Sequence, residues 1–361
     1  MDTDRLQLPA YLKALLVLSL IIVIIFILII GRSILVPLFL AGLISVLLTP
    51  IGNWMESKKI GRILSTTIAL LSGVIIILGI FAFVVLQVAS FSKDLGNVGE
   101  RLNNYLQQID GFIIEKLSIE TGIGQGFDQV YLINLLQSNS SNLAEFLLGT
   151  LGSLASVLLL PVFIFFFLLY RDHLTMFIAS LFKNHENEKI KQEIRILRKV
   201  VQNYIIGIIK VMAILAVMNI AVLFGLGIKH AVFFGVFAAL LNVIPYLGPF
   251  LGAVLPTIFA FLTKDSLFYP LGVVIAFWII QLIESNFLTP KIVGSNVNLN
   301  AFVTLVGLLV GASIWGVIGM IMIIPTMAVL KKIFELSEST MPYALLLGEE
   351  KKYVKKETDI I

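Results

Sequence analysis

The stretch Asn242-Val243-Ile244-Pro245-Tyr246-Leu247-Gly248-Pro249 lies in the middle of 33 consecutive uncharged residues, 231–263. A straight helix of that length would measure about 50 Å, whereas the hydrocarbon core of a membrane is roughly 30 Å thick. Two prolines and a glycine break such a helix. Each of the two arms, about 14 residues long, would cross only part of the core. The stretch therefore predicts a re-entrant helical hairpin.

A second uncharged segment, 299–330, is interrupted in its middle by Gly311-Ala312-Ser313-Ile314-Trp315-Gly316. Irregular backbone at membrane depth must be buried in protein or line a watery cavity. In many secondary transporters, two broken helices meet near the midplane and form the substrate site. The pair of broken segments therefore predicts transport of a small-molecule or ion substrate.

The composition is that of a membrane protein. Of the 361 residues, 58% are hydrophobic and 13% are charged, which excludes an ordinary soluble domain and makes the lipid bilayer the surrounding medium. The net charge of +4 is spread over several loops and predicts no nucleic acid partner. The absence of cysteine excludes disulfides and thiolate metal sites.

The apolar segments predict an all-α polytopic membrane protein with eight membrane elements. The six full spans are expected at about 12–30, 34–52, 63–90, 149–170, 201–228 and 267–289, beside the two broken segments. A full span followed by a broken segment occurs twice, and Leu255-Pro256-Thr257 has a counterpart in Ile324-Pro325-Thr326. If both broken segments are hairpins, they form an inverted repeat. The alternative, single broken spans, stays open.

The charges of the loops predict the orientation. Residues 171–199 contain seven basic and four acidic side chains, whereas 91–148 contain three basic and seven acidic ones. Because basic loops stay inside, 171–199 and both termini are expected in the cytoplasm and 91–148 outside. The predicted divisions are as follows: N-terminal helices, 1–90; external helical insert, 91–148; fourth span and basic linker, 149–200; transport core, 201–330; cytoplasmic tail, 331–361.

Few residues are suited to catalysis. The three histidines do not pair at metal-ligand spacing, no aspartate lies within an apolar span, and no phosphate-binding loop is present. We therefore predict no enzymatic activity, no catalytic or metal-binding residues and no cofactor, with energy drawn from a gradient.

Glu284 is the strongest candidate for coupling. It is the one carboxylate within the predicted spans, and Gln281 and Asn286 lie beside it in sequence. Burial disfavours the charged form of a carboxylate, so Glu284 is suited to exchange a proton or bind a cation. The alternative is a solvated glutamate at a helix end. Pro290 is predicted to end this helix in a turn and is included among the path residues.

The first break is the second candidate site. Pro245 and Pro249 lack an N–H group and Gly248 is conformationally free, so nearby carbonyls lose their helical partners. Together with Asn242 and the hydroxyl of Tyr246, these groups form a predicted polar pocket. A proline kink packed against neighbouring helices is the alternative.

The chain resembles the autoinducer-2 exporter family of bacterial and archaeal permeases in three blocks: 242–252, 283–294 and the glycine-rich 307–325. The resemblance implies eight membrane helices in the bacterial cytoplasmic membrane and export of the quorum-sensing signal autoinducer-2. Some members of that family look like sodium/proton antiporters, so antiport is the alternative, and a non-transporting scaffold is a third hypothesis. A homo-oligomer also stays open.

Overall fold

The computed structural model describes residues 9–94, 114, 154–180, 187–294, 298–335 and 340–349. Within these ranges the regular elements are helices, accompanied by one isolated bridge between Leu299 and Gly348. The all-helical class predicted from the sequence is confirmed. Most of the predicted external insert lies outside the described residues, including the segment from 115 to 148.

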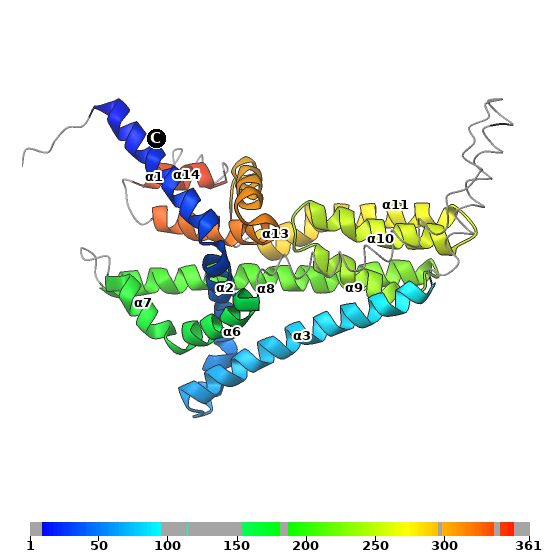
Figure 1. Ribbon diagram of the computed structural model, residues 1–361, viewed down its shortest axis with the longest axis horizontal. Coiled ribbons are helices and arrows are strands. Elements are labelled where there is room, and N and C mark those ends of the chain that lie inside the picture. The colour runs from blue at the N-terminus through cyan, green and yellow to red at the C-terminus, as the bar shows by residue number, and fades with distance from the viewer. Residues whose placement is uncertain are drawn as a thin grey trace, which may run out of the picture.

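The N-terminal helices form one part of the molecule (Figure 1). The helices α2, α3 and α6 pack around a core of small and aliphatic side chains, Ala41, Leu48, Ala69, Ile164 and Leu168. The helices of this part are α1 (Ala10–Ile30), α2 (Arg32–Ser57), α3 (Arg62–Asp94), α6 (Leu154–Leu169) and α7 (Arg171–Ser180).

The second part is built around the 39-residue helix α8, against which α9 lies along its length (Figure 1). Its main core is aromatic, with Phe233, Phe234 and Phe259 packed together. The elements of this part are α8 (Asn187–Gly225), α9 (Ala231–Leu241), α10 (Leu247–Thr263), α11 (Phe268–Ile283), the π-helices η3 (Glu284–Leu288) and η4 (Pro290–Gly294), α13 (Ala301–Phe334) and α14 (Met341–Leu347).

The chain reverses direction at the first break. The helices α9 and α10 pack against each other, and a Cβ added to Gly252 would lie 2.9 Å from the Cβ of Ala238. Tyr246 initiates α10 with a φ of 64°, in the left-handed region that side chains rarely adopt. Residues 231–263 therefore form a helix–turn–helix whose tip is 242–246.

The chain also reverses direction within α13. Trp315 and Gly316 have non-helical dihedral angles, with a φ of 62° at Gly316. A Cβ added to Gly319 would lie 1.9 Å from the carbonyl oxygen of Gly311, whereas these residues would be roughly 12 Å apart along a straight helix. Thus the arms on either side of Trp315 lie face to face.

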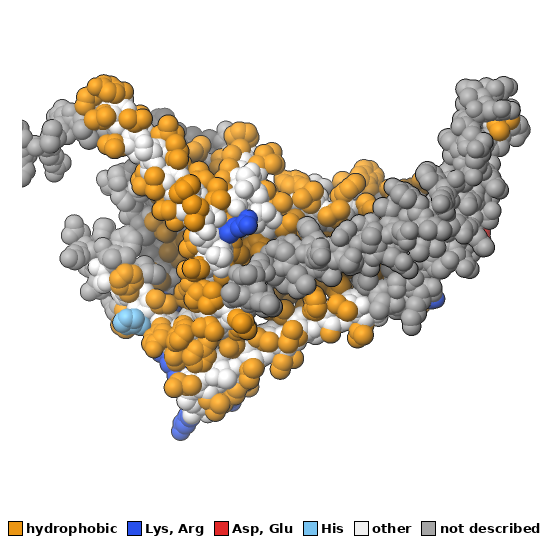
Figure 2. Space-filling view, in the orientation of Figure 1, with side chains coloured by type: hydrophobic (Ala, Val, Ile, Leu, Met, Phe, Trp, Pro, Cys, Tyr) orange, Lys and Arg blue, Asp and Glu red, His pale blue; other side chains and the backbone are white. Residues whose placement is uncertain are grey.

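Five helices in the described ranges are long and apolar enough to cross a membrane, or six if the bent pair α6 and α7 counts as one span. One of the five is α13, although its 34 residues fold back at Trp315 and do not form one straight rod. Hydrophobic side chains cover much of the exposed surface along α1 and α3 (Figure 2), as expected for helices in contact with lipid.

Candidate functional site

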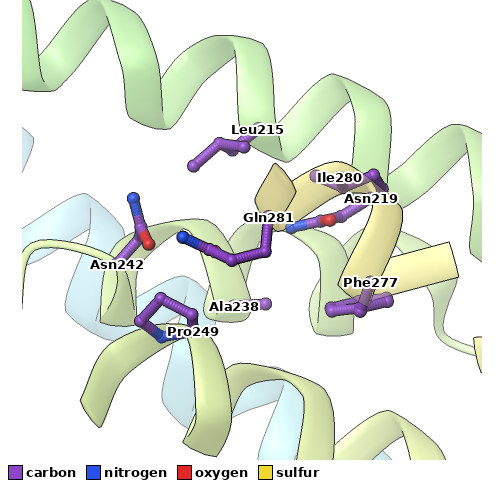
Figure 3. Close-up of a pocket in the computed structure, with 8 residues that line it drawn as sticks. All are labelled: Leu215, Asn219, Ala238, Asn242, Pro249, Phe277, Ile280 and Gln281. Atoms are coloured by element: carbon purple, nitrogen blue, oxygen red, sulfur yellow. The ribbon is translucent and has the colours of Figure 1, made fainter. Parts of the chain in front are cut away.

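A small cavity lies where the tip of the α9–α10 hairpin meets α8 and α11 (Figure 3). Its volume is about 20 Å³. This is room for about one water molecule. The lining combines four apolar side chains, one proline and three carboxamides: Leu215, Asn219, Ala238, Asn242, Pro249, Phe277, Ile280 and Gln281.

The three carboxamides come from three different elements. Asn219 lies on α8, Asn242 ends α9 and Gln281 lies near the end of α11 (Figure 3). The side chain of Asn219 is only 4% exposed, and its Oδ1 accepts no hydrogen bond from any described residue. A buried polar atom without a partner costs free energy, so this oxygen is suited to receive a donor from a bound molecule.

The cavity lies near the expected membrane midplane. Gln281 occupies the middle of the 27-residue candidate span Phe268–Gly294. The three amides are neutral and each offers both donors and acceptors, so they fit an uncharged solute with hydroxyl or carbonyl groups. No group of three His, Asp or Glu side chains able to hold a metal ion occurs in the part of the chain that the structure describes.

Glu284 lies next to the cavity and does not line it. Its side chain is 8% exposed and accepts a hydrogen bond from Gln281 Nε2 at 2.8 Å and another from the hydroxyl of Thr289. Gln281 therefore connects the buried carboxylate to the cavity. A change in the charge of Glu284 alters the hydrogen bond that orients this amide.

The π-helical turn explains why Thr289 reaches Glu284. In η3 the backbone N–H of Thr289 bonds to the carbonyl of Glu284, five residues earlier, which brings these two residues into contact. Pro290 follows directly and has no N–H to continue the α-helical pattern. The predicted turn at Pro290 is wrong, because the winding changes to π and continues to Gly294.

Of the nine predicted path residues, Asn242, Pro249 and Gln281 line the cavity and Glu284 adjoins it. The other five lie elsewhere. Gly248 is buried in the hairpin, where a Cβ would lie 1.9 Å from the carbonyl oxygen of Leu241. Tyr246 is 71% exposed because the left-handed tip turns it outward. Pro245 is half-buried, and Asn286 and Pro290 are exposed.

Asn219 is the one polar residue of the cavity lining that was not predicted from the sequence. The available signal was weak: an uncharged amide within the otherwise apolar stretch 211–228. Polar side chains within membrane segments tend to face the interior of the bundle. Only the packing of α8 against α9 and α11 brings this amide to Gln281 and Asn242.

The chain is similar to transport proteins over most of its length. YrrI of Bacillus subtilis, named "Putative transport protein", is 26% identical to this chain over 83% of the chain and 85% of YrrI. YueF of the same organism, also named "Putative transport protein", is 27% identical over 82% of this chain and 82% of YueF. The AI-2 transport protein TqsA of Escherichia coli is 23% identical over 89% of this chain and 91% of TqsA.

The family model of the AI-2E family transporters matches residues 18–338. This match confirms the resemblance drawn from the three sequence blocks. The protein is a multi-pass membrane protein and belongs to the AI-2E family of transporters.

Proposed function

We propose that this protein is a secondary transporter that moves a small polar solute across the bacterial cytoplasmic membrane through the cavity at Asn219, Asn242 and Gln281. The observation that supports this site is the convergence of three neutral carboxamides beside one buried carboxylate. Autoinducer-2, a polar furanone, is the solute we propose. The name of TqsA, an AI-2 transport protein, supports this assignment at 23% identity.

The conformation described here is a closed one. A cavity of about 20 Å³ does not hold a furanone, so α9–α10 must move relative to α8 and α11 for the solute to enter. Close packing at Gly248 and Gly252 joins α9 and α10 in a tight unit. We propose that this unit moves as one body between outward- and inward-facing states.

We propose that the two reversing segments are re-entrant hairpins that form an inverted repeat. The chain would then have eight membrane elements, and both of its termini would be cytoplasmic. Two matching positions support the repeat. Pro256 and Pro325 are both less than 2% exposed, and the following threonines bond to the carbonyl four residues back at 2.7 Å in both arms. Both second arms thus contain a buried proline followed by a threonine that bonds back to the helix backbone.

Glu284 is the proposed coupling residue. Protonation removes its charge and changes a carboxylate acceptor into a carboxylic acid that also donates. Its two hydrogen-bond donors, Gln281 and Thr289, must then rearrange, and Gln281 transmits that change to the cavity. The proton gradient would in this way bias the two conformations of the transporter.

Sodium/proton antiport is the second candidate, and the oxygen atoms of Glu284 and Thr289 favour it, because hard cations prefer oxygen ligands. Proteoliposomes containing the purified protein distinguish the two. We expect an imposed pH gradient to drive autoinducer-2 flux that sodium does not inhibit. Sodium flux without autoinducer-2 flux would establish the antiporter, and no flux of either would contradict both.

A further inference from the structure

A second cavity lies far from the amide site, between α7 and the beginning of α8. Its volume is about 190 Å³, and its lining combines two arginines, one aspartate, one threonine and two apolar side chains: Asp172, Thr175, Met176, Ile194, Arg195 and Arg198. Pockets that enclose a whole drug-sized ligand usually measure roughly 300–1,000 Å³. This cavity therefore suits a single charged group better than a complete small molecule.

The direction of α7 places this cavity at the membrane surface. The axis of α7 is bent by 71° from that of α6 at the break around Tyr170. If α6 crosses the membrane, a bend of this size directs α7 along the membrane surface. Met176 and Phe177 are each 56% exposed on this helix, as expected where a helix contacts acyl chains.

Two described carboxylates in this region are already paired. Glu56 of α2 bonds to Arg171 at 2.5 Å, and Asp172 bonds to Arg62 of α3 at 2.8 Å. Arg62, which is not part of the lining, therefore compensates the negative charge of Asp172.

The two arginines of the lining have no such partner in the described ranges. Arg198 donates to two neutral oxygens, Thr175 Oγ1 at 2.9 Å and the carbonyl of Arg171 at 3.4 Å. Asp172 stabilises the charge of Arg198, whereas Arg171 and Arg195 oppose it. A guanidinium has five N–H donors, so Arg198 retains donors for an anion, and Arg195 is exposed beside it. The lining therefore has two arginines against one carboxylate, Asp172, which Arg62 already binds.

We propose that this cavity binds the phosphate of an anionic phospholipid of the cytoplasmic leaflet. Arginine pairs recognise phosphate through parallel, charge-assisted hydrogen bonds. Basic pockets between membrane helices on the cytoplasmic side bind such headgroups. Thr175 adds a hydroxyl donor, and the acyl chains would extend over Met176 and Phe177. The bound lipid holds α7 against α8 and so joins the N-terminal helices to the transport core.

The test uses the purified full-length protein in neutral detergent and follows its thermal unfolding midpoint. Titration with phosphatidylglycerol is expected to raise the midpoint, whereas phosphatidylcholine and inorganic phosphate leave it unchanged. Arg195→Gln and Arg198→Gln should each weaken the apparent affinity for phosphatidylglycerol about fivefold. Arg32→Gln removes an exposed arginine at the opposite end of α2 and should respond like the wild type.

Each outcome decides the proposal. An equal response to both phospholipids, or a full response in Arg195→Gln, would overturn the site. A response to inorganic phosphate alone would show a free-anion site and overturn the lipid assignment. Arg198 also contacts Thr175, so its replacement could impair folding. Arg195 is exposed, and its variant then provides the answer alone.

Discussion

Gln281 donates a hydrogen bond from Nε2 to the carboxylate of Glu284 at 2.8 Å, and the same side chain lines the amide cavity. The buried carboxylate and the proposed solute site thus share one residue. In the proposed coupling, this hydrogen bond transmits a change in the protonation of Glu284 to the neutral cavity.

Replacement of Asn219 by alanine should impair transport without unfolding the protein. The Oδ1 of Asn219 has no hydrogen-bond partner in the described ranges, so its loss removes no contact from that atom in the closed state. Loss of one hydrogen bond to the solute predicts about a tenfold lower kcat/KM in a proteoliposome flux assay. Asn286→Ala, at an exposed amide outside the cavity, is the matched control and should transport normally.

Replacement of Gly248 by alanine should open the α9–α10 hairpin. The added Cβ would lie 1.9 Å from the carbonyl oxygen of Leu241, and the nearest atoms all belong to the backbone, which prevents a small adjustment. We expect transport to be lost and the free energy of unfolding to fall by about 1–3 kcal/mol. Gly79→Ala is the control, because a Cβ there meets no atom within 4 Å. Equal stability and activity of the two variants would contradict the packing at the tip.

Trp315, at the point where α13 reverses direction, contacts the N-terminal helices α1 and α2. Its indole Nε1 donates to the carbonyl of Leu28 at 2.9 Å, and its ring lies 5.5 Å from that of Phe39. Trp315→Phe keeps an aromatic ring and removes the donor, so stability in a denaturation assay should fall by about 1 kcal/mol. Trp278→Phe, at an exposed tryptophan of α11, should change it much less.

If the two reversing segments are re-entrant hairpins, the loop at Ser266 faces the outside of the cell and the loop at Ser295 faces the cytoplasm. Single cysteines at Ser266 and Ser295 are to be labelled in whole cells by an impermeant thiol reagent. As re-entrant hairpins, 231–263 and 299–330 require labelling of Ser266→Cys from outside and of Ser295→Cys only after permeabilisation. Labelling of Ser295→Cys in intact cells would mean that 299–330 crosses the membrane once.

The sequence predicted the two breaks because their causes are local. Pro245 lacks an N–H group within the first break, and Gly316 has a φ of 62° in the second. In both cases an uncharged run longer than a membrane-spanning helix requires indicates the break. The place of Asn242 in the cavity also followed from its position beside the first break, and that of Gln281 from its position near Glu284.

Other features depend on contacts between distant segments. Asn219 belongs to the site only because α8 packs against α9 and α11. The outward direction of Tyr246 follows from a left-handed φ of 64°, which no sequence pattern specified. Proline usually ends a helix, but here a π-helix continues from Pro290 to Gly294. In this segment Val293 packs against Gly207 of α8, a contact that the sequence alone does not reveal.

The most direct test of proton-coupled transport through this site is flux of autoinducer-2 in proteoliposomes with the wild type and with Glu284→Gln. Glutamine resembles the neutral carboxylic acid in size and does not titrate. We predict that wild-type flux rises with an imposed pH gradient, whereas Glu284→Gln exchanges solute at a rate independent of that gradient. Wild-type dependence on pH in Glu284→Gln would contradict the coupling role of Glu284.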